Sequence, residues 1–256
     1  MDIYTINIMT NIIAAFSCLF VGYFFGSIPV SIVIGKVFFH QDPRDYGSKN
    51  AGGTNSGRLW GKKVGFLVIV LDMIKTIAPV WICWTIVTFV PFGGKPLMQT
   101  VQNFYNNPDS TYIIQWPVYW LAPLGTVIGH CWPMFAQFKG GKGVSNFMGI
   151  TCGSSWMLGF LPGLLYFALL KWKKYVSLAG MLQSVIVSLF YWTWAILNLT
   201  GVVKGFEWLP AYGPTFDINW VAAIVITLMS IILIARHHEN IKRLKNGTER
   251  KITWMK

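Results

Sequence analysis

Residues 64–90, VGFLVIVLDMIKTIAPVWICWTIVTFV, form an apolar run that is long enough to cross a lipid bilayer as one helix. In the whole chain, 54% of the residues are hydrophobic, 12% are charged and the mean hydropathy is +0.50. This composition is not that of a soluble globular domain. Further apolar runs lie at about 8–34, 118–135, 143–170, 175–198 and 218–235. We therefore expect an all-α, polytopic integral membrane protein with a single membrane-embedded domain over residues 1–256.

The distribution of Lys and Arg predicts how these runs are threaded through the membrane. Loops rich in Lys and Arg stay on the cytoplasmic side. All the cation-rich loops lie on one side only if the run 143–170 crosses twice, as two short helices that meet near Gly159. The sequence thus predicts seven transmembrane segments, an exterior N-terminus and a cytoplasmic C-terminus. The cation-rich loops are 36–63, 139–142, 171–174 and 236–256.

Several classes of function are disfavoured by the remaining composition. The net charge of +12 would suggest nucleic acid in a soluble protein, but here the cations lie between apolar runs, where they favour lipid headgroups. The four cysteines are single and lack metal-binding spacing, so we expect reduced thiols and no metal. No Lys or Arg precedes the first run, which is expected to be retained rather than cleaved. The loops 91–117 and 199–217 carry little charge and are predicted to be exterior connectors.

The stretch 42–58, DPRDYGSKNAGGTNSGR, is a polar island between two apolar runs. Its glycines allow successive backbone N–H groups to converge, while its hydroxyls, amides and cations suit a phosphate oxyanion. A solvated turn has the same composition, and the stretch alone does not separate the two interpretations. The candidate ligands are Arg44, Gly47, Ser48, Asn50, Gly52, Gly53, Thr54, Asn55 and Arg58.

A second glycine- and lysine-rich loop occupies 129–143, GHCWPMFAQFKGGKG, and opens into a helix after Val144. Lys139 and Lys142 surround glycines that let an anion approach closely, and a helix N-terminus adds partial positive charge. A short cytoplasmic loop with extended lysines is the alternative. The glycines are Gly140, Gly141 and Gly143, and His130 at the start of the loop is a candidate general base.

Three further places carry polar groups in or beside the apolar runs. Ser27 lies beside a proline kink, and Asp72 and Lys75 share one face of a helix as either site residues or a buried structural pair. If the last span continues as a helix, His237 and Asn240 share a face beside Arg236 and could contact a polyanionic ligand.

Together these motifs resemble the bacterial acyl-phosphate:glycerol-3-phosphate acyltransferase family over nearly the whole chain. They are GSIP at 26–29, DxRxxGSxNxGxTNxxR at 42–58, Asp72 with Lys75, GHxxPxFxxFKGGKGV at 129–144 and RHxxNIxRLxxGxE at 236–249. The sequence departs from the family where Lys49 replaces a usual glycine, Gly53 a usual alanine and His40 a common glycine.

The resemblance implies transfer of a fatty acyl group from acyl phosphate to the sn-1 hydroxyl of glycerol 3-phosphate. The products are lysophosphatidic acid and inorganic phosphate, in the first step of phospholipid synthesis. It implies a multi-pass protein of the bacterial plasma membrane with its active site on the cytoplasmic side. Acyl phosphate has a good leaving group, so no cofactor is expected. The resemblance does not specify which acyl chains are preferred or how many subunits assemble.

The resemblance also implies roles for the residues. Phosphate or substrate binding falls to the glycines and polar residues of both loops, with Lys75 and Arg236, while Asp72 and Glu249 give structural support. The general base stays open among His130, His237 and a substrate phosphate oxygen. A transporter of a phosphorylated small molecule is the alternative function. The implied catalytic residues are Ser27, Arg44, His130, Lys139, His237 and Asn240.

Overall fold

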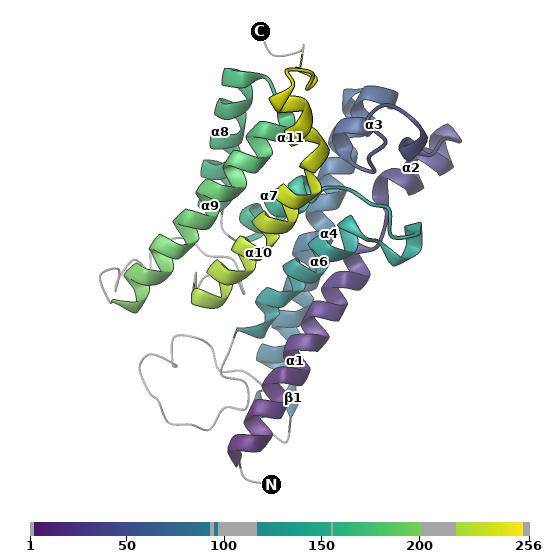
Figure 1. Ribbon diagram of the computed structural model, residues 1–256. Helices are drawn as coiled ribbons and strands as arrows, with labels where there is room; N and C mark the ends of the chain where they lie inside the picture. The colour runs from purple at the N-terminus through teal and green to yellow at the C-terminus, as the bar shows by residue number, and fades with distance from the viewer. Residues whose placement is uncertain (1–2, 93–94, 97–116, 155, 201–218, 253–256) are drawn as a thin grey trace.

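The computed structural model describes residues 3–92, 95–96, 117–154, 156–200 and 219–252 (Figure 1). The described chain is helical apart from the short antiparallel pair β1 (Pro91–Phe92) and β2 (Lys95–Pro96). The predicted exterior loops 91–117 and 199–217 lie largely outside the described residues. The helices are α1 (Ile3–Gly26), α2 (Val30–Phe39), α3 (Gly53–Trp60), α4 (Lys62–Phe89), α6 (Leu121–Cys131), α7 (Val144–Ser154), α8 (Trp156–Lys173), α9 (Val176–Leu199), α10 (Trp220–Arg236) and α11 (His238–Lys245).

The long apolar runs form long helices, as the sequence predicts. Three stretches are long and apolar enough to cross a membrane: Met9–Phe39, Lys62–Phe89 and Val176–Leu197. A fourth is added if α10 and α11, which are bent by 58° relative to each other, count as one broken span. The membrane-spanning character is therefore confirmed, while the number seven stays a prediction.

The first run breaks at the predicted proline kink. α1 ends at Gly26 and α2 begins at Val30, with Ser27, Ile28 and Pro29 between them. Pro29 has no N–H to donate to the preceding turn, so the break leaves backbone carbonyls that need other partners. The carbonyls of Gly26 and Ile28 accept hydrogen bonds from Lys75 of α4.

The run 143–170 forms two helices, but the predicted meeting point near Gly159 is wrong. α7 ends at Ser154 and α8 begins at Trp156, so Gly159 and Pro162 both lie inside α8. Prolines occur inside membrane helices more often than inside soluble ones. The side-chain amide of Gln183 in α9 donates to the Pro162 carbonyl and so connects α9 to α8 at this proline.

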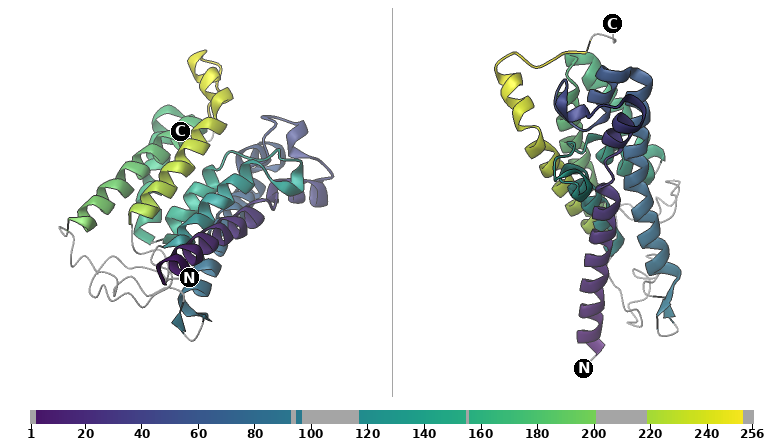
Figure 2. Two further views of the ribbon diagram at one scale, coloured as in Figure 1. Left: turned by 60° about the horizontal axis from the view of Figure 1, so that its bottom comes forward. Right: turned by 90° about the vertical axis from the view of Figure 1, so that its right-hand side faces the viewer.

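Small residues bring α1 and α6 into close contact (Figures 1 and 2). Gly22 and Gly26 of α1 and Gly125 and Gly129 of α6 are each four residues apart, so each pair occupies one face of its helix. A Cβ atom at any of the four would meet the backbone of the opposite helix. This spacing of small residues is typical of close helix packing in membranes.

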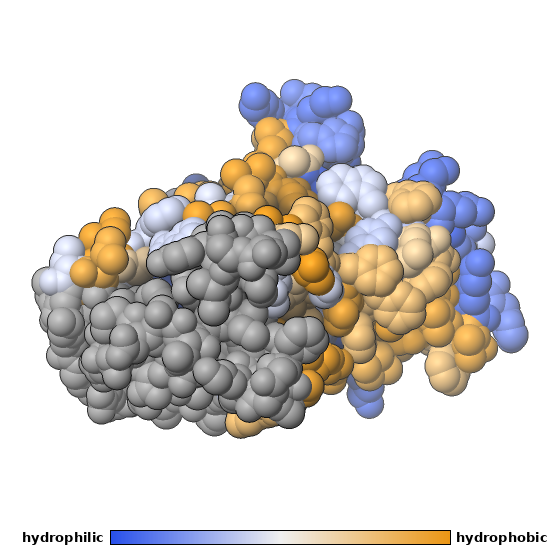
Figure 3. All heavy atoms as spheres, turned by 90° about the horizontal axis from the view of Figure 1, so that it is seen from below, coloured by the Kyte–Doolittle hydropathy of each residue, from blue (hydrophilic) through white to orange (hydrophobic). Residues whose placement is uncertain are grey.

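The buried core lies where α4, α6, α9 and α10 meet. Trp120 and Tyr191 are fully buried there, and their rings pack edge to face at 6.3 Å. Many large apolar side chains point outward instead, among them Phe16, Phe20 and Phe66. Seen from below, hydrophobic residues cover much of the described surface, while hydrophilic residues lie at its edges (Figure 3). An apolar outer surface is what contact with lipid tails requires.

The polar loops gather at one end of the bundle. α2, α3, α11 and the α8–α9 turn all lie at the top of Figure 1, whereas α1 begins at the bottom. The loop before α7 approaches this end from the side. Segments far apart in the sequence are thus brought together, as the distribution of cations predicts.

Candidate active site

Arg44 connects the two glycine-rich loops. It lies in a short 3₁₀ turn, Pro43–Asp45, and its guanidinium forms a 2.7 Å ion pair with Asp42. The same guanidinium donates to the Ala136 carbonyl at 2.9 Å and to the Lys139 carbonyl at 3.4 Å. The guanidinium therefore holds the loops together, with its charge already opposed by a carboxylate.

Asn55 fixes the shape of the first loop from inside. Only 1% of the residue is exposed, and its side-chain oxygen accepts from the Ser48 N–H at 3.0 Å. Its amide nitrogen donates to the carbonyls of Pro43 and Tyr46 at 2.7 and 3.2 Å. Both ends of the Asn55 amide bind the loop backbone, so this residue holds the first loop in shape.

Two positions in the first loop need a left-handed backbone. Gly47 has φ +61°, and a Cβ there would meet the Asn55 side-chain oxygen. Lys49 has φ +54°, a conformation that glycine adopts at little cost and most other residues disfavour. The departure noted at Lys49 therefore falls where the backbone itself favours glycine.

The rest of the loop divides into exposed and buried positions. Ser48 and Thr54 are exposed, and Asn50 and Gly52 are partly exposed, so all four are accessible to a ligand. Gly53, in contrast, is buried at the start of α3, where a Cβ would meet Ile69 and the Gly65 carbonyl of α4.

The second loop folds back on the end of α6. The N–H groups of Gly140 and Gly141 donate to the carbonyls of Cys131 and His130 at 3.2 and 2.9 Å. Both glycines pack so closely on this segment that neither has space for a Cβ. Gly143, with φ +83°, then leads into α7 at Val144, which confirms the predicted helix start.

Lys142 points toward α11 and the segment that follows it. Its ammonium donates to the Asn240 side-chain oxygen at 2.6 Å, and the Asn240 amide nitrogen donates to Glu249 at 2.7 Å. Burial, together with nearby cations such as Arg243, lowers the pKa of Lys142 to about 8. Lys139 is exposed, and its side chain is free to face solvent at the rim of the loop.

Glu249 is the carboxylate around which these cations gather. Arg243 donates to one of its oxygens at 2.7 Å, and Ser177 and Asn240 donate to the other at 2.7 Å. Partial burial by itself would raise the pKa of Glu249, but these hydrogen bonds outweigh it and hold the pKa below its ordinary value. Glu249 is therefore ionised at neutral pH.

The end of α10 contributes Arg236 and His237. Arg236 donates to the Gly141 carbonyl at 3.2 Å, and its guanidinium lies over the Trp132 ring. The predicted continuous helix through His237 and Asn240 is wrong, because α10 ends at Arg236 and α11 starts in a different direction (Figure 2). His237 is 3% exposed and its Nδ1 lies 2.7 Å from the Leu233 carbonyl, so Nδ1 carries the proton and Nε2 is free to accept one.

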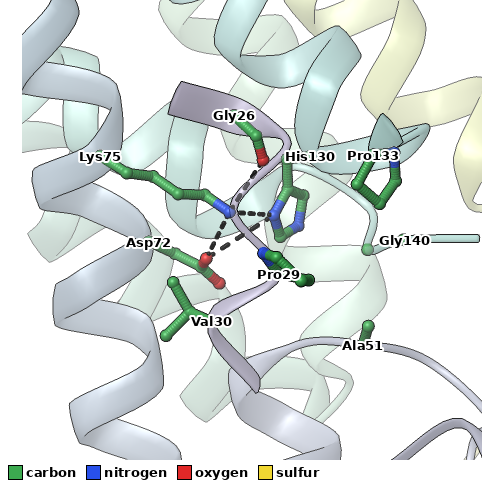
Figure 4. Close-up of a pocket in the computed structure, with 10 residues that line it drawn as sticks. Gly26, Pro29, Val30, Ala51, Asp72, Lys75, His130, Pro133 and Gly140 are labelled. Atoms are coloured by element: carbon green, nitrogen blue, oxygen red, sulfur yellow. Dashed lines mark hydrogen bonds and ion pairs between the residues drawn. The ribbon is translucent and has the colours of Figure 1, made fainter. Parts of the chain in front are cut away.

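A buried ionic cluster lies beneath the loops (Figure 4). The Lys75 ammonium is 2.9 Å from Asp72 and 3.1 Å from His130 Nδ1, and it also donates to the carbonyls of the α1–α2 break. Lys75, Asp72 and His130 are all less than a tenth exposed. The pocket beside them is lined by Pro29, Ala51, Pro133 and Gly140, among others.

This cluster supports the interpretation of Asp72 and Lys75 as a buried pair, although both also line the pocket. Lys75 is surrounded by protein acceptors, so the ammonium stabilises the helix break. His130 Nδ1 faces Lys75, while its Nε2 lies beside Gly141 and the residue lines the pocket. Ser27 is fully buried, and its hydroxyl accepts from the Met134 N–H at 3.3 Å.

Two polar residues near the site were not anticipated from the sequence. Asn146 of α7 is fully buried and donates to Thr76 at 2.9 Å and to the Asp72 carbonyl at 3.3 Å. Ser177 in the first turn of α9 contacts Glu249. An asparagine in an apolar run is a usable signal, since polar groups in membranes are costly without partners. A lone serine gives no such signal.

A family model described as glycerol-3-phosphate acyltransferase matches residues 16–247. The chain belongs to the glycerol-3-phosphate acyltransferase family. Relatives of that name from Enterococcus faecalis and Staphylococcus aureus are both 32% identical, covering 92% and 93% of this chain and 91% and 97% of their own lengths.

The fold of this acyltransferase is also similar to solved structures. The integral membrane glycerol 3-phosphate acyltransferase PlsY in its glycerol 3-phosphate form superposes with a TM-score of 0.67 at 28% identity. The match covers 93% of this chain and 96% of that one. The lysophosphatidic acid form of PlsY gives a TM-score of 0.64 at 27% identity, with 93% and 95% coverage.

Proposed function

We propose that this acyltransferase moves a fatty acyl group from acyl phosphate to the sn-1 hydroxyl of glycerol 3-phosphate, which begins phospholipid synthesis. The observation that carries the proposal is the meeting of both glycine-rich loops with Arg58, Lys142, Arg236 and Arg243 at one end of the bundle. Such a site suits two phosphates. The glycerol 3-phosphate and lysophosphatidic acid forms of PlsY support the same acceptor and product.

The reaction needs positioning more than a covalent intermediate. The acceptor hydroxyl oxygen attacks the acyl carbonyl carbon, a new ester C–O bond forms, and the bond from that carbon to the phosphate oxygen breaks. The hydroxyl proton passes to a base, and inorganic phosphate leaves with the bonding electron pair. Holding the two reactants in register can supply about 7–11 kcal/mol of the barrier.

Two cradles divide the phosphates. The first is formed by the accessible residues of the 42–58 loop: Gly47, Ser48, Asn50, Gly52, Thr54 and Arg58. The second is formed by Lys142, Gly143 and the N-terminus of α7, where Lys142 and Arg236 oppose charge on the departing phosphate. Gly140 and Gly141, whose N–H groups bind the carbonyls of Cys131 and His130, let this loop pack closely on the end of α6. Lys139 stands at the open rim of this cradle.

His237 is the better placed of the two candidate bases. Its Nδ1 is held by the Leu233 carbonyl, so Nε2 accepts the proton of the acceptor hydroxyl. His130 Nδ1 is held by Lys75, so only its Nε2, at the pocket beneath the loops, is left to act as a base. A phosphate oxygen of the substrate remains the alternative base.

The buried members of the motifs position these cradles. Arg44 joins the loops, Asn55 shapes the first loop, and Gly53 seats α3 on α4. Asp72, Lys75 and Ser27 secure the α1–α2 break beneath the site.

We place the protein in the bacterial plasma membrane as a single domain with seven transmembrane segments. The N-terminus is exterior and the C-terminus cytoplasmic. The active site then opens to the cytoplasm, which suits a water-soluble acceptor and a donor whose acyl chain lies in lipid.

Membranes that contain the protein should be mixed with labelled glycerol 3-phosphate and, in separate reactions, acyl phosphate, acyl-CoA or acyl-carrier protein. We expect lysophosphatidic acid from acyl phosphate alone, and little from Arg58→Ala or Lys142→Ala proteins that fold normally. No product from any donor, together with protein-dependent uptake of glycerol 3-phosphate into vesicles, would favour the transporter.

A further inference from the structure

The segment after α11 is bound to the α8–α9 turn. The Ile252 N–H donates to the Lys174 carbonyl at 2.8 Å. The Ile252 side chain is 8% exposed and packs with Leu170 of α8 and Ala179 of α9. The turn therefore fixes the course of the chain just after Glu249.

Ser177 makes the polar contact within this junction. It lies in the first turn of α9, is 4% exposed, and its hydroxyl donates to Glu249 Oε1 at 2.7 Å. A carboxylate can only accept, so the direction of this hydrogen bond is settled. A hydrogen bond to a buried charged group is also among the stronger ones.

The same carboxylate oxygen determines which way the Asn240 amide faces. Asn240 Nδ2 lies 2.7 Å from Glu249 Oε1, and only the NH₂ end of an amide can donate there. The opposite end, Oδ1, must then face Lys142, whose ammonium is 2.6 Å away. A flipped amide would direct its NH₂ group at the ammonium and leave Glu249 without that donor.

We propose that Ser177, which lies outside all the glycine- and cation-rich motifs, is a positioning residue for acyl transfer. Its hydroxyl fixes Glu249, Glu249 orients the Asn240 amide, and that amide holds the Lys142 ammonium at the second cradle. This inference rests on the proposed function for its effect on catalysis, while the Lys142 contact can be measured without any substrate.

Several charged or titratable groups lie near Glu249 and also influence its charge. Those that interact with it are Arg58 of α3, Lys142 of the second loop, His237 at the end of α10 and Arg243 of α11. Arg236 lies near Lys142 and His237, and Arg250 near Arg58. Because Arg243 keeps its own 2.7 Å contact, loss of the Ser177 hydroxyl should loosen Glu249 without expelling it.

Ser177→Ala should lower kcat by roughly tenfold, the effect of one hydrogen bond to a charged group. The KM for glycerol 3-phosphate should change by less than about twofold, because the cradles remain. Glu249 would lose one of the hydrogen bonds that favour its ionised form, so its pKa should rise and the acidic limb of the kcat profile should move to higher pH. Ser177→Thr keeps the hydroxyl, so its kcat and the position of its acidic limb should both be close to those of the wild type.

The matched control is Ser188→Ala, in the same helix. Ser188 is also buried, but its hydroxyl donates only to the Ser184 carbonyl one turn earlier. This variant should keep the wild-type kcat and pH profile. Thermal unfolding of each protein in detergent checks that the comparison is between folded enzymes.

Lys142 reactivity gives a readout that is independent of activity. Intact protein is treated with a small acylating reagent between pH 6 and pH 9, and modification of Lys142 is quantified by mass spectrometry. In Ser177→Ala the ammonium loses a well-placed acceptor, so Lys142 should be modified more readily below pH 8, while Ser188→Ala matches the wild type. Unchanged Lys142 reactivity and kcat in a folded Ser177→Ala protein would overturn the inference. If wild-type protein lacks acyl transfer, only the proposed function fails, and the Lys142 measurement still decides the role of Ser177.

Discussion

At the scale of single residues, the two loops are shaped by side chains whose polar groups are paired with other protein groups. Asn55 occupies both ends of its amide with the loop backbone, and Arg44 pairs with Asp42 while it holds the second loop. The sequence identifies these residues as part of a polar motif. It does not reveal which of them point inward, because that depends on the path of the folded loop.

The pH dependence of the reaction should report Lys142. Its pKa of about 8 means that the positive charge, which in the proposed mechanism opposes charge on the departing phosphate, is lost as the pH rises through that value. We expect kcat to fall above about pH 8. In Lys142→Arg the guanidinium stays charged, so the basic limb should move well above pH 9 even if the maximal rate is lower. An unchanged basic limb in this variant would assign the titration to another group.

The buried Lys75 should matter chiefly for stability. Lys75→Met leaves Asp72 as an uncompensated buried charge and removes the donor to the Gly26 and Ile28 carbonyls. Breaking such a pair costs about 3–5 kcal/mol, which thermal unfolding in detergent would detect.

A double variant tests the reason for that cost. Lys75→Met combined with Asp72→Asn removes the unpaired charge, so it should be more stable than Lys75→Met alone. Equal stability of the two proteins would show that the carbonyls of the helix break, and not Asp72, dominate the effect.

At the scale of helices, glycines at the contact between α1 and α6 allow the backbones of the two helices to pack directly against each other. The apolar runs predict that helices exist, but which helices touch depends on the faces that carry small residues. The glycines at 22, 26, 125 and 129 were an available signal in the sequence, since their four-residue spacing is typical of membrane helix pairs. The boundary between α7 and α8 was harder to predict from the sequence, because the glycine and proline inside α8 are residues that usually break helices.

Gly125→Ala tests the α1–α6 contact. Its Cβ would meet the Leu19 carbonyl, so the helices must separate, and we expect a loss of about 1–3 kcal/mol in the free energy of unfolding. Gly163→Ala in α8 is the matched control, because a Cβ there meets nothing within 4 Å. That variant should be neutral or more stable by up to about 1 kcal/mol, as expected for alanine in a helix. Equal behaviour of the two variants would contradict a packing role for Gly125.

At the scale of the whole molecule, the polar loops lie together at one end, while α1 begins at the other. Charge counting predicts this arrangement because it requires no knowledge of side-chain contacts, only of which side each loop occupies. The same counting cannot predict that Glu249 and Lys142 meet through Asn240, since those contacts arise from the bend after α10.

Cysteine labelling in cells tests the predicted orientation. A cysteine introduced at Lys63 or Lys251, both exposed in the structure, should react with a membrane-impermeant maleimide only after the membrane is opened. A cysteine in the predicted exterior loop, for example at Asn106, should react in intact cells. Protein without an introduced cysteine gives the background from the native thiols. Reaction of all three positions from the same side would exclude the seven-segment arrangement.

The chain order of the contacts around Glu249 has a consequence for biogenesis. Asn240 and Glu249, the two groups nearest Lys142 in this series of hydrogen bonds, come from residues 236–252, which follow every apolar run in the sequence. Both glycine-rich loops can leave the ribosome and reach their final side of the membrane before residues 236–252 are synthesised. A nascent chain that lacks α10 and α11 therefore has both loops but cannot hold the Lys142 ammonium in place, and catalytic competence arises only after the last helix has been inserted.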